Sequence, residues 1–265
     1  MAADCLADGF RLVDAQADIA RYAACLAFLD GLPSFAMYKA YVCDVAARAS
    51  GPSLDVGCGL GYDVLRVARR VPGHTAFGID LSDTFLDAAR AQAEALGVAN
   101  AQFRRMDARH LEFADGAFAS ARIDRSLQHM AEPDRVVSEM VRVTRRDGEI
   151  ILAEPDWGTF FVGDRSAQAD RVSECFGRKF QNPDIGRRVA ALLEASGAEM
   201  IDLRGYALVA RGAAEMDEVF DVARTCELLD SEDAGDGYRE WWREISRSGG
   251  VIGSVTIFVA VGRTT

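Results

Sequence analysis

The sequence predicts an α/β protein built around a mostly parallel sheet. From residue 50 onward, short apolar runs alternate with amphipathic segments that have helical spacing. The periodicity changes from strand-like to helical across a glycine-rich turn that follows residues 53–56. A second apolar run, residues 75–79, then ends in an acid, Asp80. These observations together are typical of a nucleotide-binding strand-turn-helix-strand unit.

Composition indicates a globular chain that acts on small molecules. Its 265 residues are 49% hydrophobic and 9% aromatic, enough for a large core. Thirty basic residues stand against 41 acidic ones, a net charge of -11. Because nucleic-acid affinity comes mainly from cationic contacts to phosphate, this balance opposes nucleic-acid binding. We expect a helical cap or lid over residues 1–49 and one catalytic domain over residues 50–265.

The cysteines and histidines suggest a reducing compartment and no metal. The six cysteines contain no C-x-x-C pair, and none of the three histidines has the spacing of a metal ligand. Asp4 and Asp8 lie where a signal peptide would need positive charge, and no apolar run approaches the length of a membrane span. The sequence therefore predicts a cytoplasmic protein without a membrane span.

Two helices precede the first strand. The apolar residues of the first, from Ile19 to Leu29, fall on one face, and the segment 30–33 breaks it. A second helix is expected over residues 34–49. Its aromatic residues either pack this cap onto the sheet or face a ligand pocket, and both readings stay open.

The glycine turn has the chemistry of a ligand cradle. Gly57, Gly59 and Gly61 alternate, so ligand atoms could approach the backbone closely there. Asp80, at the end of the second strand, could accept hydrogen bonds from both hydroxyls of a ribose. Asp63 follows the glycines directly, at the start of the next helix. A carboxylate there would repel a phosphate, which argues for a ligand without phosphate.

The remaining elements follow in alternation. Ser82 is a candidate N-cap for the helix after Asp80, and Gly97 ends that helix. A lid-like insertion is expected at about residues 159–185, where periodicity is weak. The other expected elements are helices at 62–71, 133–146, 186–196, 215–229 and 238–247, and strands at 101–106, 117–123, 148–154, 199–210 and 251–261.

LDVGCGLGYDV followed by GIDLS resembles motif I and the acidic ribose site of class I S-adenosylmethionine-dependent methyltransferases. The stretch LQHMAEPDRVVSEMVRVTRRDGEIILAEPDWGTF is similar to the ubiquinone/menaquinone-biosynthesis group and to bacterial enzymes of specialised metabolism. The resemblance implies a Rossmann-like, seven-stranded, mostly parallel sheet with helices on both faces, its last strand antiparallel. It also implies S-adenosylmethionine as cofactor and S-adenosylhomocysteine as product.

The resemblance implies a set of site residues as well. His129, in the loop after the fourth strand, would face the transferred methyl group, either as general base, as an orienter of the acceptor or as a structural histidine. The cofactor would be bound by Asp55, Gly57, Gly59, Gly61, Asp80, Leu81, Asp107, Ala108, Arg125 and Gln128. The acceptor would be bound by Tyr22, Phe35, Tyr38, His129, Trp157 and Phe160.

The resulting functional expectation is transfer of a methyl group to an O, N or C atom of a small molecule, such as a specialised metabolite or a quinone-like acceptor. The alternative is an enzyme that keeps the cofactor structurally and catalyses a cyclisation or rearrangement. Nucleic-acid and protein methyltransferases are disfavoured by the acidic charge and by the absence of an N-P-P-Y-like motif. A dehydrogenase is disfavoured by the glycine spacing. A homodimer is left open.

Overall fold

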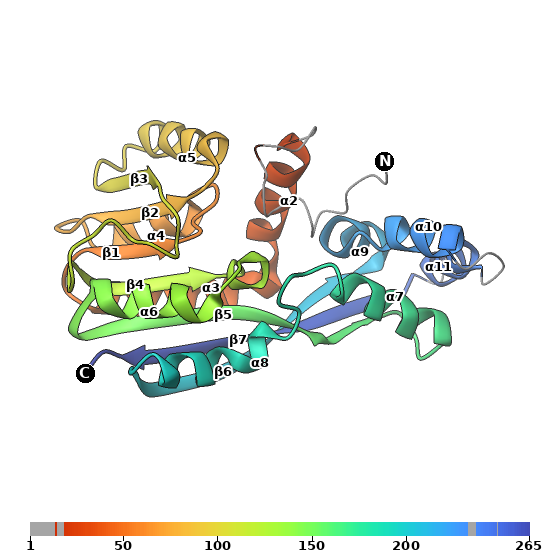
Figure 1. The fold of residues 1–265 in the computed structure, drawn as a ribbon. Coiled ribbons are helices and arrows are strands. Elements are labelled where there is room, and N and C mark those ends of the chain that lie inside the picture. Colours follow the sequence, from red (N-terminus) through yellow and green to blue (C-terminus); the bar gives the residue numbers. More distant parts are fainter. Residues whose placement is uncertain (1–13, 15–18, 233–236, 248) are drawn as a thin grey trace.

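A single seven-stranded sheet organises the chain (Figure 1). The computed structural model describes residue 14 and residues 19–232, 237–247 and 249–265. The strand order is β3-β2-β1-β4-β5-β7-β6, and β7 runs antiparallel to both β5 and β6. The strands are β1 (Ser53–Val56), β2 (Ala76–Asp80), β3 (Ala101–Arg105), β4 (Phe118–Asp124), β5 (Thr144–Val162), β6 (Glu199–Arg211) and β7 (Ile252–Arg263). The expected fold class is confirmed.

Helices cover both faces of the sheet and bury two apolar clusters. The helices are α2 (Ile19–Gly31), α3 (Pro33–Arg48), α4 (Tyr62–Arg70), α5 (Asp83–Ala95), the 3-10 turn η2 (Leu127–His129), α6 (Pro133–Val143), α7 (Ala167–Gly177), α8 (Ile185–Ala195), α9 (Gly212–Phe220), α10 (Val222–Glu232) and α11 (Tyr238–Arg247). One cluster lies under α2 to α5, and the other lies under α6 and α8. Successive residues of β5 alternate between them, with Ile150 in one and Ile151 in the other.

The expected start of α5 is confirmed at atomic detail. The Ser82 hydroxyl accepts a hydrogen bond from the Phe85 N–H at 3.0 Å, the N-cap interaction. This matters for the site because the capped turn directly follows Asp80, at the tip of β2.

Strand β5 is much longer than its sequence suggests. The expected strand was 148–154, whereas β5 continues to Val162 and pairs with β7 through Phe161 and Val162 after an irregularity. The long ends of β5, β6 and β7 carry α7, α9, α10 and α11 away from the rest of the sheet (Figure 1). The expected irregular insertion at 159–185 is therefore a strand end, helix α7 and turns. Whether it acts as a lid stays a prediction, as does the division into residues 1–49 and 50–265.

Two further differences concern the ends of the chain. The helix expected at 215–229 is two helices, because Asp221 takes a left-handed conformation (φ 49°) between α9 and α10. The cap is described only from Ile19 onward and at residue 14; the rest of the expected segment 1–49 lies outside the described residues. Among the helices of the described ranges, none combines the length and apolar character needed to cross a bilayer.

Candidate active site

A cavity of about 460 Å³ lies at the carboxyl ends of β1, β2, β3 and β4 and beside β5. Its size is that of a small-molecule site, and its place is where open α/β sheets bind ligands. The residues expected to bind ligand that lie in its wall are Asp55, Gly57, Gly59, Asp80, Leu81, Asp107, Ala108, Arg125, Gln128, Phe35, His129 and Trp157.

Four expected site residues lie outside the cavity wall. An added Cβ at Gly61 would be 2.6 Å from Phe103, so this glycine permits close packing of the turn on β3. Tyr38 is fully buried, and its hydroxyl donates to Asp124 at 3.2 Å. Tyr22 and Phe160 are buried in the apolar cluster. For Tyr22 and Tyr38, packing of the cap onto the sheet was one of the two readings left open above.

Asp80 ties the glycine turn to the start of α5. One carboxylate oxygen accepts the Gly59 N–H at 2.9 Å and the other accepts the Ser82 N–H at 3.0 Å. Burial raises the pKa of this carboxyl, an effect that the backbone N–H groups oppose. A carboxylate offers about four acceptor positions. Two hydrogen bonds therefore leave room for hydroxyls of a ligand in the cavity.

The glycine turn is open on the side of the cavity. Gly57, Gly59 and Gly61 all have positive φ. An added Cβ at Gly59 would meet nothing closer than Leu26 Cδ1, at 3.4 Å. An added Cβ at Gly57 would lie 2.5 Å from the Ser126 hydroxyl instead. Gly59 is thus the position where a side chain would occupy ligand space, and Gly57 is where the turn packs on the loop after β4.

Asp107 is held by its neighbour Arg109. The guanidinium donates to the carboxylate, with the shortest distance 2.7 Å, and the Arg109 backbone N–H adds another bond at 2.9 Å. The guanidinium of Arg109 keeps the pKa of Asp107 below its ordinary value. Both residues lie in the cavity wall, at the end formed by β2 and β3.

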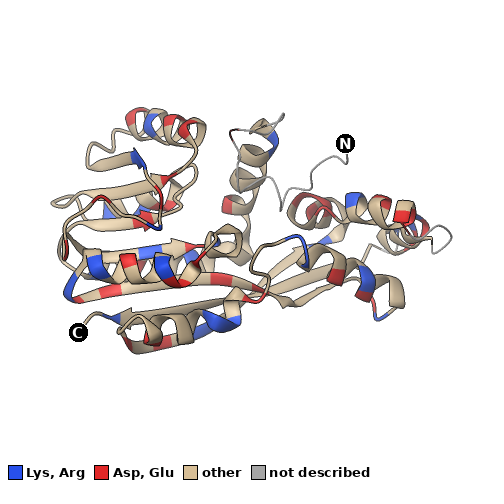
Figure 2. Ribbon diagram, in the orientation of Figure 1, with Lys and Arg blue, Asp and Glu red and all other residues tan. Residues whose placement is uncertain are grey.

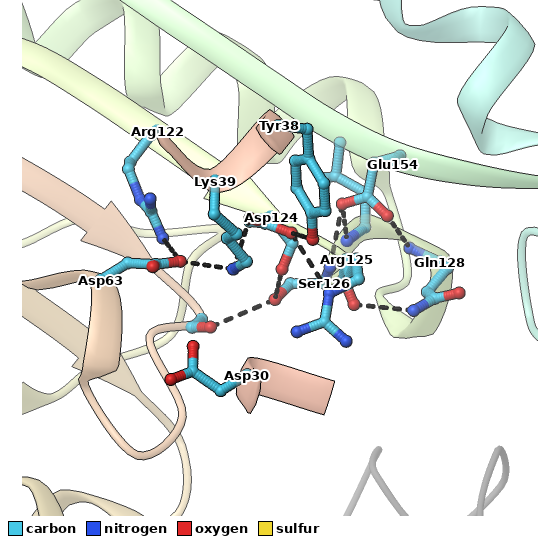
Figure 3. Close-up of polar contacts among 12 residues, drawn as sticks. Asp30, Tyr38, Lys39, Asp63, Arg122, Asp124, Arg125, Ser126, Gln128 and Glu154 are labelled. Carbon is cyan, nitrogen blue, oxygen red and sulfur yellow. Dashed lines mark hydrogen bonds and ion pairs between the residues drawn. The ribbon is translucent and has the colours of Figure 1, made fainter. Parts of the chain in front are cut away.

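The loop after β4 is fixed by Glu154, which the sequence analysis did not single out. This side chain on β5 is fully buried and accepts the N–H groups of Ser126, Leu127 and Gln128 at 2.9, 2.7 and 3.3 Å. Burial raises the pKa of Glu154 to about 8, although the backbone N–H groups oppose this. Figure 3 shows Glu154 beside Ser126 and Gln128 of this turn, whose backbone is thereby anchored to the sheet. His129 is the last residue of the turn.

Buried charges join the cap to the sheet (Figure 3). Lys39 of α3 pairs with Asp63 and, at 2.7 Å, with Asp124. Arg122 of β4 pairs with Asp63 at 2.7 Å and with Asp55, its neighbour across the strands, at 2.9 Å. Burial raises the pKa of Asp55 to about 6, against the opposing pull of Arg122. The sequence signal for this network was a lysine on the apolar face of a helix and an arginine within an apolar strand.

The other end of the cavity is apolar and aromatic. Trp157 and Phe180 stack with ring centroids 4.3 Å apart, and the Trp157 indole N–H donates to the Gln128 side chain at 2.8 Å. Phe176 and Phe220 contribute further rings. The His129 ring lies 5.5 Å from that of Phe180. His129 thus lies beside the aromatic end of the cavity.

Comparison with known proteins points to one family. A methyltransferase domain model matches residues 54–148, from β1 to the start of β5. The chain is 30% identical over 237 residues to an uncharacterized 37.1 kDa protein in transposon Tn4556 of Streptomyces fradiae, covering 86% of this chain and 67% of that protein. It is 38% identical over 103 residues to phosphatidylethanolamine N-methyltransferase of Cereibacter sphaeroides, covering 38% of this chain and 49% of that enzyme.

Solved structures share the fold at low sequence identity. The crystal structure of the [4+2]-cyclase SpnF matches with a TM-score of 0.57 and 23% identity, covering 86% of this chain and 80% of that one. At this identity the similarity concerns the fold alone, and it extends well beyond the residues that the methyltransferase domain model matches.

Proposed function

Because this chain belongs to the class I S-adenosylmethionine-dependent methyltransferases, we propose that it transfers the methyl group of that cofactor to a small molecule with an apolar body. The observation that carries the proposal is one cavity that joins the Gly59–Asp80 turn to the Trp157–Phe180 wall. A cofactor at the first end and an acceptor at the second would meet beside His129.

The cofactor end fits S-adenosylmethionine. Asp80 is half-buried and has acceptor positions left for ribose hydroxyls, and the open face of Gly59 allows close approach. Six acidic side chains and four basic ones line the cavity within the described ranges: Asp30, Asp55, Asp63, Asp80, Asp107 and Asp124 against Lys39, Arg109, Arg122 and Arg125. A wall with an excess of carboxylates stabilises a cation. When bound, the cofactor supplies a methyl group already activated on a positively charged sulfur.

The chain's own task is then alignment and, for a protic acceptor, removal of a proton. The anchored turn after β4 holds His129 at the junction of the two ends of the cavity, within a rigid frame made by Glu154. An imidazole titrates near neutral pH, which suits a proton taken from a hydroxyl or an acidic carbon. An acceptor packed against the aromatic wall would exclude water from this junction.

The test is a binding and turnover experiment. Calorimetric titration with S-adenosylhomocysteine should show binding to the wild-type protein, and a labelled-methyl assay with apolar phenols, quinols and carboxylic acids should yield a methylated product. The matched control is Asp80→Ala, which should lose most of the binding. Absence of any binding of S-adenosylhomocysteine by the wild-type protein would refute the proposal.

The same assay separates the alternative, a cyclisation or rearrangement in which the cofactor is only structural. That reaction would convert an acceptor while S-adenosylmethionine stays intact. Methyl transfer would instead form one S-adenosylhomocysteine for each product. The observation that favours this alternative is the fold that the chain shares with the [4+2]-cyclase SpnF.

A further inference from the structure

Arg125 has an unusual place in the backbone. It is a non-glycine residue with positive φ (53°), directly after β4. This conformation costs about 1–2 kcal/mol for an L-residue, so surrounding contacts must hold it. Its N–H donates to the Ala153 carbonyl at 2.8 Å, and the next residue, Ser126, is bound by Glu154. The backbone therefore sends the Arg125 side chain into the cavity.

Only part of its guanidinium hydrogen-bonds to the described residues of the protein. Nε contacts Asp124 at 3.3 Å, and the group lies over the Phe35 ring at 4.9 Å. Asp124 already pairs with Lys39 at 2.7 Å. Within the described part of the chain, neither Nη1 nor Nη2 of Arg125 donates to a protein acceptor, and Figure 3 shows both lying clear of the network. The side chain is 19% exposed, and it forms part of the cavity wall.

Arg125 lies toward the aromatic end of the cavity. The Gln128 side chain donates to the Arg125 carbonyl at 2.8 Å and accepts the Trp157 indole N–H at 2.8 Å, so Arg125 is joined to the aromatic wall. The guanidinium of Arg125 lies over the ring of Phe35, another residue of the cavity wall. The cation at the opposite end, Arg109, is already paired with Asp107.

We propose that Arg125 selects an acceptor that carries an anionic oxygen, such as a carboxylate or an ionised enol, beside its apolar body. A guanidinium whose two Nη groups face an enclosed cavity binds such a group through two parallel hydrogen bonds. A neutral acceptor would leave these two groups removed from water with a weaker hydrogen-bond acceptor or none. This inference rests on the proposed function, because it assigns the aromatic end of the cavity to the acceptor.

The experiment uses two probes of nearly equal shape, naphthalene carboxylate and naphthalene carboxamide. Each is titrated into the full-length protein with and without saturating S-adenosylhomocysteine, following tryptophan fluorescence. The wild-type protein should prefer the carboxylate by roughly 10- to 100-fold, the range of a charge-assisted hydrogen-bonded pair. Arg125→Met should abolish the preference, and Arg125→Lys should keep part of it because the charge remains.

Arg109→Met is the matched control, because it removes a cavity cation at the other end and should leave the ratio of the two affinities unchanged. Equal binding of both probes by the wild-type protein would overturn the proposal, as would a preference that survives Arg125→Met. A loss of S-adenosylhomocysteine affinity in Arg125→Met that matches the loss for the carboxylate would assign Arg125 to the cofactor instead. Titration without S-adenosylhomocysteine keeps this test separate from that of the proposed function, which is decided by cofactor binding and by formation of a methylated product.

Discussion

Replacing Glu154 with Gln should change how the stability of the protein depends on pH. The Glu154 carboxyl is fully buried on β5 and accepts three backbone N–H groups from the loop after β4. Its pKa is raised by burial from the ordinary 4.5 to about 8. Between these two values the native protein keeps a proton that the unfolded chain has lost. The free energy of unfolding therefore falls as pH rises through this range.

The size of the effect follows from the two pKa values. They differ by about 3.5 pH units, and at roughly 1.4 kcal/mol per unit the Glu154 contribution falls by about 5 kcal/mol between pH 4.5 and pH 8. Glu154→Gln has no proton to lose. Its stability relative to the wild type should therefore rise with pH by an amount of this order, even if the variant is less stable at low pH.

Urea denaturation of both proteins at about pH 5, 6, 7 and 8 measures the difference directly. Glu240→Gln, at an exposed position of α11, is the matched control, and its free energy of unfolding should depend on pH as that of the wild type does. If the Glu154→Gln and wild-type curves run parallel, the carboxyl is ionised in the native protein. The three N–H groups would then outweigh burial, and the reasoning above would be wrong.

Three further predictions concern the cavity. Asp80→Ala should weaken S-adenosylhomocysteine binding by roughly 1–3 kcal/mol in a calorimetric titration, because hydrogen-bonding groups lose their partner; unchanged affinity in a folded variant would exclude the ribose role. Gly57→Ala should lower Tm more than Gly59→Ala, because the added Cβ lies 2.5 Å from the Ser126 hydroxyl in the first and no closer than 3.4 Å to any atom in the second; equal Tm values would contradict the packing. His129→Ala should reduce turnover by roughly 10²- to 10⁴-fold with S-adenosylhomocysteine affinity nearly unchanged. Full turnover with the same acidic limb of the pH–rate profile would rule out His129 as the base.

Local signals in the sequence were sufficient to bring the glycine turn and Asp80 together at one end of the cavity. The glycine turn, the acid at the tip of the second strand and the Ser82 cap each depend on residues close together in the chain. Parallel strands bring their carboxyl ends to one edge of the sheet, so Gly57, Asp80 and Asp107 lie in one cavity wall as expected.

Which aromatic residues lie in the cavity wall was predicted less well. An apolar period identifies the buried face of a helix, but it does not tell which residue on that face reaches a cavity. Phe35 lies in the cavity wall, whereas Tyr38 is fully buried outside it. The extension of β5 was missed because its partner is β7, about 90 residues later in the chain, and strand pairing at that distance leaves little local trace.

The amino-acid sequence by itself determined the fold class, the glycine turn and the position of Asp80, because alternation, turn chemistry and strand ends are properties of neighbouring residues. Tertiary structure decided that Glu154 anchors the loop that carries His129, and that Lys39, Asp63 and Arg122 form one buried network. It also left the guanidinium of Arg125 open to the cavity. Each of these depends on charges brought together from distant segments and removed from water, and burial of that kind exists only once the chain has folded.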